Sequence, residues 1–367
     1  MDFIGNQHRR FRFDRRYRAL TGASRTGVAR DVEAGFPLLP AGCHIDLDRE
    51  VARLVLANIR QTLQLRWADL AAELAALPEP TTLAAFLEET GLEVGDLYRR
   101  RKGWSELRRA AGRGKAAGPD DKKLGQAFGR MLHTDDAERL DFVRHIVDGG
   151  ALRGVRHHRL LAMLDATLWG GTNPASTAEA RLADLLRHPD RVSELRELSA
   201  LLADGRRRVT LPLSGDIPLH VHATYSKNEA LAAFGVDKPG HMREGVKWVP
   251  EAQADLFFVT IDKSTGHYSP TTMYHDRAIT RESFQWESQS TLRQVNPTAQ
   301  RYRSGRSSVH LFMREHKRDE GLGAPPYTYA GPMSFDHCDG DRPVRFRWRL
   351  EHALPAEVFH YAKVTAG

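Results

Sequence analysis

Polar side chains in the last third of the chain alternate with aromatic ones, which places possible ligand-binding groups on one face of a strand. Residues 284–290 read Phe-Gln-Trp-Glu-Ser-Gln-Ser. Side chains of a strand alternate between its two faces, so the two aromatic rings share one face and Gln285, Glu287 and Gln289 share the other. Amide groups can read the edges of nucleobases. An ordinary half-buried strand with a wet polar face is the structural alternative.

A second strand-like run, at residues 344–351, carries a row of arginines. Its apolar residues point one way, and they are Phe346, Trp348 and Leu350. The arginines point the other way, and they are Arg345, Arg347 and Arg349. Guanidinium groups gathered on one face must be solvated or matched by anions, and phosphates match them well. We therefore expect this face either to be solvated or to bind phosphate.

Two further groups of residues suggest other chemistry. His220 and His222 are two residues apart, so a strand would present both imidazoles on one face, a spacing that metals accept. No recognisable motif supplies a third ligand, so we predict no metal and no other cofactor. Asp255, Asp262 and Lys263 could converge in a metal-dependent nuclease. Acids and lysines at strand ends also serve solubility alone.

A loop rich in hydroxyl groups adds to the binding hypothesis. Residues 263–272 read Lys-Ser-Thr-Gly-His-Tyr-Ser-Pro-Thr-Thr, and Tyr274 follows. Rings with a few directed polar groups suit a nucleobase, either single-stranded or flipped from a duplex. We predict no catalytic residue. The residues predicted to contact nucleic acid are Lys263, Tyr268, Tyr274, Glu287, Gln289, Arg301, Arg314, Arg345, Arg347 and Arg349.

The elements that position these groups are predicted to change from helices to strands along the chain. Apolar residues at three- and four-residue steps predict helices over residues 48–205. A helix-turn-helix could lie at residues 81–111, although plain helix packing produces the same pattern. Short strand-like runs over residues 206–367 predict a mainly antiparallel barrel or half-barrel. We thus expect an α+β protein with a basic connector at residues 1–47, a helical region and a β-rich domain.

Three capping signals are visible within this pattern. Asp135 with Glu138, Ser176 with Glu179, and Ser226 with Glu229 have the spacing of a residue that caps a helix and an acidic residue three positions later. Each pair precedes apolar residues at helical spacing, so we expect a helix to begin at each.

Composition limits the class of protein. The chain has 367 residues, of which 41% are hydrophobic and 28% charged, as in soluble globular proteins. Its net charge of +7 is compatible with a polyanionic partner. Two cysteines make no disulfide framework, and we find neither a membrane span nor a signal peptide, so we expect a cytoplasmic protein. In residues 112–119 the lysine is not followed by the Ser or Thr of a phosphate-binding loop, so we expect no ATP hydrolysis.

Several motifs, in order, resemble one protein family. They lie at residues 219–229 (Leu-His-Val-His-Ala-Thr-Tyr-Ser-Lys-Asn-Glu), 263–274, 284–290, 311–315, 327–332 and 348–350. They resemble the C-terminal domain of unknown function of long bacterial DEAD/DEAH-box helicases, which often carry a phospholipase-D-type nuclease domain. Residues 2–6 and 35–43 resemble the segment that follows the second helicase lobe in those proteins.

The resemblance implies a role beside DNA-translocating machinery in restriction or phage defence, and it implies no catalytic residue. The Walker, Asp-Glu-x-His and His-x-Lys-x-x-x-x-Asp motifs of the helicase and nuclease parts are missing from this sequence. Our preferred hypothesis is non-catalytic recognition of DNA, including a modified or flipped base, with a helicase or nuclease supplied in trans. Two alternatives stay open: a metal-dependent nuclease in the β-rich domain, and a protein-interaction scaffold that docks a helicase.

Overall fold

The computed structural model describes most of the chain after residue 65. The described residues are 17, 28, 31–36, 51–53, 55–56, 66–98, 102–118, 121–170, 176–206, 208–242, 244–261, 276–317 and 324–363. The chain divides into two compact units, Met1–Gln126 and Ala127–Gly367. The second unit contains helices as well as the sheet, and the boundaries expected at residues 47 and 205 stay predictions.

Short helices make up the described part of the first unit. They are α4 (Trp67–Ala76), α5 (Leu83–Thr90), α6 (Val94–Tyr98), α7 (Trp104–Ala110) and most of α8 (Asp121–Phe128). Helix α5 begins where the Thr82 hydroxyl accepts a hydrogen bond from the Ala85 amide, and it ends at Gly91 with a φ of 64°. The rings of Phe86 and Trp104 pack 5.4 Å apart in a buried core. The helix-turn-helix function of this region stays a prediction.

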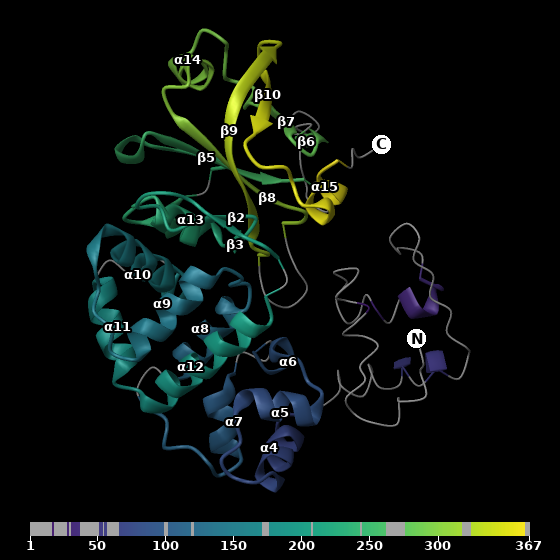
Figure 1. Cartoon of the computed structure of the whole chain (residues 1–367), viewed down its shortest axis with the longest axis vertical. Coiled ribbons are helices and arrows are strands. Elements are labelled where there is room, and N and C mark those ends of the chain that lie inside the picture. Colours follow the sequence, from purple (N-terminus) through teal and green to yellow (C-terminus); the bar gives the residue numbers. More distant parts are fainter. Residues whose placement is uncertain are drawn as a thin grey trace. The chain divides into compact units, whose positions relative to one another are not determined.

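The second unit has a helical layer and a sheet, with one helix between them (Figure 1). The helices of the layer are α9 (Ala137–Val147), α10 (Gly154–Trp169), α11 (Ala178–Leu186) and α12 (Pro189–Asp204). Helix α13 (Lys227–Ala233) packs against α10 on one side and contacts the short strand β3 (Thr224–Tyr225) on the other. Short 3-10 helices lie at Gly129–Met131, Pro239–His241 and Pro250–Ala252. No helix in the described ranges combines the length and hydrophobicity needed to cross a membrane.

The main sheet is mostly antiparallel. Its order is β4 (Val246–Val249), β5 (Ala254–Thr260), β8 (Ser308–Arg314), β9 (Tyr327–Asp339), β10 (Arg345–Leu350), β7 (Ser283–Glu287) and β6 (Arg277–Thr280). Strand β3 pairs with β9, β5 runs parallel to β8, and β1 (Leu211–Pro212) pairs with β2 (His220–Val221) in a small second sheet. The predicted α+β class is confirmed. Among the described strands, the edge strands β4 and β6 do not pair with each other, so the sheet is open and is not a closed barrel.

The aromatic face of the sheet forms the core of the β-rich part. In the pairing of β10 with β7, Phe346 lies opposite Trp286 and Trp348 lies opposite Phe284. All four rings are buried, and Trp286 packs against Phe257 with ring centroids 4.4 Å apart. Helix α14 (Pro297–Ser304) and helix α15 (Ala356–Ala362) contribute further buried side chains to this core. The polar residues of β7 and β10 therefore point to the opposite face.

Replacing Trp286 by alanine should lower the free energy of unfolding by about 3–5 kcal/mol, the usual cost of truncating a buried aromatic residue. Gln289, three residues along the same chain segment, is exposed and serves as the control. Gln289→Ala should change the stability by less than about 0.5 kcal/mol. Chemical denaturation of the two variants measures both values, and an equal effect would contradict the assignment of Trp286 to the core.

Candidate nucleic-acid interface and a buried polar network

The polar face of β6, β7, β10 and β9 gathers arginines from separate strands. Arg347 lies opposite Gln285 on β7 and opposite His337 on β9, while Arg277 on β6 also lies opposite Gln285. Directly opposed residues of antiparallel strands point to the same face. Arg349 lies on this face between Ser283 and Ser334, and its side chain is exposed.

Carboxylates match only part of this positive charge. Arg345 lies between Glu287 and Asp339, with Nε 3.1 Å from Glu287 Oε1 and a terminal nitrogen 3.2 Å from Asp339 Oδ1. The Arg345 side chain is 49% exposed, so water screens these ion pairs. Among the described residues, Arg347 makes one long contact, at 3.5 Å, with the amide oxygen of Gln285. The face thus carries four described arginines, and the carboxylates of Glu287 and Asp339 pair with one of them, Arg345. The predicted residues Glu287, Arg345, Arg347 and Arg349 come together on this face.

Arg301 lies elsewhere and already has an anionic partner. Two of its nitrogens donate to the Asp255 carboxylate at 2.9 Å each, and its guanidinium lies 4.1 Å from the centre of the Trp248 ring. Asp255 is fully buried and also accepts from the Ser307 hydroxyl at 2.7 Å. Asp255, one acid of the possible nuclease site, is therefore already bonded to other side chains of the fold. Its other two members, Asp262 and Lys263, lie outside the described residues.

The remaining predicted contacts are dispersed. Arg314 donates to the Thr260 hydroxyl at 3.1 Å and to the Pro325 carbonyl at 3.2 Å, and it lies over the Tyr327 ring. These contacts fix its guanidinium within the fold. Gln289 follows the end of β7 and is exposed. Lys263, Tyr268 and Tyr274 lie outside the described residues.

The expected pair of histidines on one strand face is not observed. Strand β2 ends at Val221, and His222 adopts a φ of 72°. The His222 ring therefore does not point in the direction that an extended strand would give it. The His222 ring lies beside His352, with centroids 6.5 Å apart, whereas His220 contacts Glu138. Within the described residues no three His, Cys, Asp or Glu side chains are grouped so that they could hold a metal ion.

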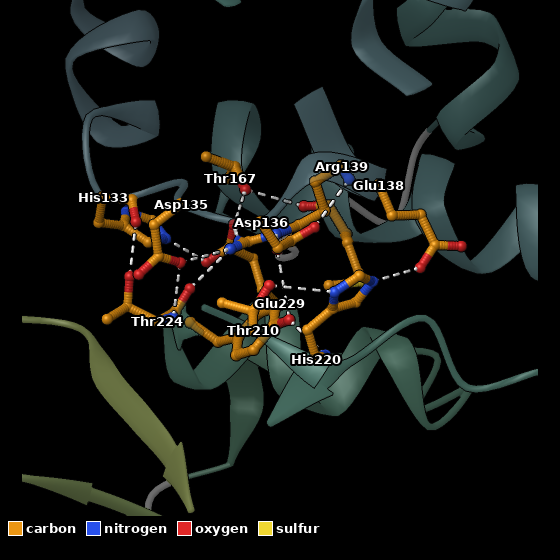
Figure 2. Close-up of polar contacts among 12 residues, drawn as sticks. His133, Asp135, Asp136, Glu138, Arg139, Thr167, Thr210, His220, Thr224 and Glu229 are labelled. Atoms are coloured by element: carbon orange, nitrogen blue, oxygen red, sulfur yellow. Dashed lines mark hydrogen bonds and ion pairs between the residues drawn. The ribbon is translucent and has the colours of Figure 1, made fainter. Parts of the chain in front are cut away.

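A buried network, which the sequence did not reveal, joins the helical layer to the sheet (Figure 2). Arg139 on α9 donates to Asp136, to Glu229 on α13 at 3.0 Å and to the Thr224 carbonyl on β3 at 2.7 Å. Its guanidinium also lies 4.1 Å from the centre of the Tyr225 ring. Burial alone would lower the pKa of Arg139, but Asp136 and Glu229 outweigh it and raise the pKa. The charge is therefore permanent.

Glu229 is the acidic centre of this network. Its carboxylate accepts from Thr167 at 2.6 Å, from Arg139 at 3.0 Å and from the Ser226 amide at 2.6 Å, and it lies 2.6 Å from His133 Nε2. Burial would raise the pKa of Glu229, but His133 and Arg139 hold it well below its usual range. The capping box predicted for Ser226 and Glu229 is confirmed, and its glutamate has these further partners.

Glu138 forms a second polar cluster at the start of α9. Arg156 donates to both of its oxygens, and His220 Nε2 lies 3.0 Å from Oε2. Burial would raise the pKa of Glu138, but hydrogen bonds from His220 and Arg156 outweigh it and lower the pKa to about 2. The predicted caps at Asp135 and Ser176 are each wrong by one residue. Asp136 caps α9, while Asp135 accepts from the Thr224 amide at 2.8 Å. Thr177 caps α11, where its hydroxyl accepts from the Ala180 amide.

Comparison with known proteins identifies a similar domain for the β-rich part. A family model described as Domain of unknown function (DUF3427) matches residues 219–362, from the start of β2 to the end of α15. This match supports the expected resemblance to a domain of unknown function over that segment. No curated protein matches the chain. One solved structure with some similarity is that of Arabidopsis thaliana SUVH6 in complex with SAM, at 11% identity and a TM-score of 0.27. The match covers 62% of this chain and 40% of that chain, and it is too weak to inform fold or function.

Glu229→Gln should lower the free energy of unfolding by about 3–5 kcal/mol, because it leaves the buried Arg139 without one of its two closest carboxylates. An exposed ion pair provides the comparison, since the side chains of Asp184 and Arg187 are 60% and 75% exposed. Asp184→Asn should cost at most about 1 kcal/mol. Urea denaturation at neutral pH measures both, and a loss for Glu229→Gln as small as that for Asp184→Asn would count against the network.

The Glu138 cluster should make the free energy of unfolding depend on pH. The folded pKa of about 2 lies below the ordinary value of 4.5, so the unfolded chain binds the proton first as the pH falls. The stabilisation is fully present above pH 4.5 and is lost as the pH falls toward 2. The free energy of unfolding of the wild type should therefore converge on that of Glu138→Gln over this interval. Glu251→Gln, at an exposed position, is the control, and a gap that stays constant with pH would contradict the assignment.

Proposed function

We propose that the chain binds DNA through the polar face of β6, β7, β10 and β9 and catalyses no reaction on it. In this proposal it serves a helicase or nuclease supplied by another chain, in restriction or phage defence. The observation that supports it best is the row of arginines on β10, extended by Arg277 on β6, of which Arg345 alone has carboxylate partners among the described residues. Guanidinium groups form paired hydrogen bonds with phosphate oxygens, and this geometry suits them to a nucleic-acid backbone.

The spacing of the arginines also favours a phosphate partner. Side chains two residues apart on a strand lie about 6.6–6.8 Å from each other, which is close to the separation of successive phosphates along a nucleic-acid strand. The opposite side of β10 is locked into the core by Phe346 and Trp348. The backbone that carries the arginines is therefore rigid before DNA binds. Binding has to order only the arginine side chains, which keeps its entropic cost small.

Recognition of a particular base needs groups beyond this row. Gln285 is buried beneath the arginines. Gln289 is exposed beyond the end of β7, so its amide group is better placed to contact a base. The aromatic rings of β7 and β10 are in the core and cannot stack on a base. A stacking partner for a flipped base would have to be another ring, and Tyr268 and Tyr274 in the undescribed segment 262–275 are our candidates.

The two alternatives are less well supported. A metal-dependent nuclease built on Asp255 would have to break its contacts with Arg301 and Ser307, because both of these side chains donate hydrogen bonds to its carboxylate. A scaffold that touches no nucleic acid leaves the arginine row without a role. Salt-dependent DNA binding separates the scaffold from the proposed function, and magnesium- or manganese-dependent cleavage would favour the nuclease.

The double variant Arg347→Ala/Arg349→Ala should weaken binding to all DNA sequences alike, because phosphate contacts carry no sequence information. Each lost contact with duplex DNA should reduce the slope of log K against log salt concentration by about 0.9. Fluorescence anisotropy over a series of salt concentrations measures both quantities. Arg187→Ala removes an arginine of the same charge from the position that follows α11, and it should leave the affinity and the slope nearly unchanged.

A variant that should strengthen DNA binding provides a second test of this face. Asp339→Asn removes an exposed carboxylate that lies 3.2 Å from Arg345, so it should strengthen binding if this face contacts DNA. A double variant that binds with wild-type affinity and slope, together with an unchanged Asp339→Asn, would assign the arginines to a merely solvated face.

A further inference from the structure

Two arginines of the polar face flank one buried amide. In the register of the sheet, Arg277 on β6 and Arg347 on β10 both lie opposite Gln285 on β7, the strand between them. Neighbouring strands are about 4.7–4.9 Å apart, so the backbones of the two arginines are separated by about twice that distance. An extended arginine side chain spans more than half of this gap. Both guanidinium groups can therefore reach the space above Gln285.

The floor of this space is polar and fixed. Gln285 is 6% exposed, and its amide oxygen lies 3.5 Å from a terminal nitrogen of Arg347. This contact places the Arg347 guanidinium toward β7, which is the side of Arg277. On the opposite face of the sheet, Phe284 and Trp286 anchor β7 in the core. The floor therefore needs no further ordering when a ligand binds above it.

The guanidinium of Arg277 has a hydrogen-bond donor that the fold does not use. Its Nε is buried, and no described residue accepts a hydrogen bond from it. Leaving a buried donor unsatisfied is costly, so nearly all such groups in proteins have a partner, which can be an ion or a water molecule. The unused donor of Arg277 therefore points to an acceptor that comes from outside the described residues.

The electrostatics of this part of the face favour an anion as that acceptor. Of the arginines on the face, Arg345 alone has carboxylate partners among the described residues, and they are Glu287 and Asp339. Asp276, which precedes β6, accepts a hydrogen bond from the Glu287 amide at 3.0 Å. The two guanidinium groups beside Gln285 repel each other, and an anion placed between them turns this repulsion into two attractions.

We propose that Arg277 and Arg347 form a clamp that holds a single phosphate group above Gln285. This inference rests on the proposed function of the face and adds that two strands hold the same phosphate. A guanidinium donates two parallel hydrogen bonds, so two of them can occupy the free oxygens of one phosphate. Arg349 lies farther along β10, opposite Ser283, and contacts a different phosphate in this arrangement.

The phosphate group can come from two parts of a DNA molecule. An internal phosphodiester carries one negative charge, whereas a terminal phosphate monoester carries nearly two. Both present free oxygens to the clamp, so the chemistry of recognition is shared. The experiments below first test the clamp and then separate these two sources.

Inorganic phosphate tests the clamp without DNA. In melting experiments on the full chain at constant ionic strength, phosphate should raise the melting temperature of the wild type more than that of Arg277→Ala or Arg347→Ala. Phosphate stabilises folded proteins in general, so the difference between the wild type and each variant is the informative quantity. Arg349→Ala is the matched control and should respond to phosphate as the wild type does.

A lysine variant covers the case in which Arg277→Ala fails to fold. Arg277→Lys keeps the positive charge but loses the planar fork of donors. Its melting temperature should therefore rise less with phosphate than that of the wild type. An equal response to phosphate in the wild type and in all variants of Arg277 and Arg347 would overturn the proposal.

A double-variant comparison tests whether the two arginines hold the same phosphate of DNA. Fluorescence anisotropy with one duplex gives the loss of affinity for Arg277→Ala, for Arg347→Ala and for the two combined. The combined variant should bind roughly 2–100-fold better than the product of the single losses implies. Arg277→Ala combined with Arg349→Ala should instead give losses that multiply to within about twofold. Losses that also multiply for Arg277 and Arg347 would overturn the shared phosphate.

Two forms of the same duplex, with 5′-phosphate or 5′-hydroxyl ends, separate the sources of the phosphate. An equal loss of affinity for both forms in Arg277→Ala assigns an internal phosphodiester to the clamp, and a loss confined to the phosphorylated form assigns the terminal monoester. Failure of the proposed function has a different signature. A wild type that binds no DNA but responds to inorganic phosphate through Arg277 and Arg347 would retain the clamp and remove DNA as its ligand.

Discussion

The buried guanidinium of Arg139 is the interaction on which the second unit depends. It lies at the start of α9 and binds carboxylates from its own helix and from α13, together with a carbonyl of β3. A buried charge is tolerated only when its partners are in place, so these three elements must assemble together. The helical layer and the sheet are therefore parts of one cooperative unit.

The strands β7 and β10 assign hydrophobic and charged side chains to opposite faces. Phe284, Trp286, Phe346 and Trp348 fill the core, which leaves the arginines of β10 at the surface. Arg349 is exposed and Arg347 makes one long contact with Gln285, so both guanidinium groups can reach a polyanion while their backbone stays fixed. The two carboxylates beside Arg345 lower the local charge. The positive potential is therefore concentrated toward Arg347 and Arg349.

Local patterns in the sequence predicted local structure well. Period-two alternation identified the faces of β7 and β10, and the spacing of Ser226 and Glu229 identified the cap of α13. What failed depended on long-range pairing. Closure of the sheet depends on whether its end strands meet, and the direction of the His222 ring depends on where β2 stops. Apart from Asp136, the partners of Arg139 and Glu138 come from segments far apart in the sequence, so no local spacing of residues predicts them.

The order of strands has a consequence for how the sheet is completed. Among the described strands, the β6–β7 hairpin precedes β8 and β9 in the chain, yet it pairs with the sheet only through β10, which follows both of them. An isolated hairpin is marginally stable, so β6 and β7 must wait until β10 bridges them to β9. The parallel pairing of β5 with β8 likewise joins strands that are separated in the chain by β6, β7 and α14. During synthesis, the arginine-bearing face therefore cannot form before β10 has been made.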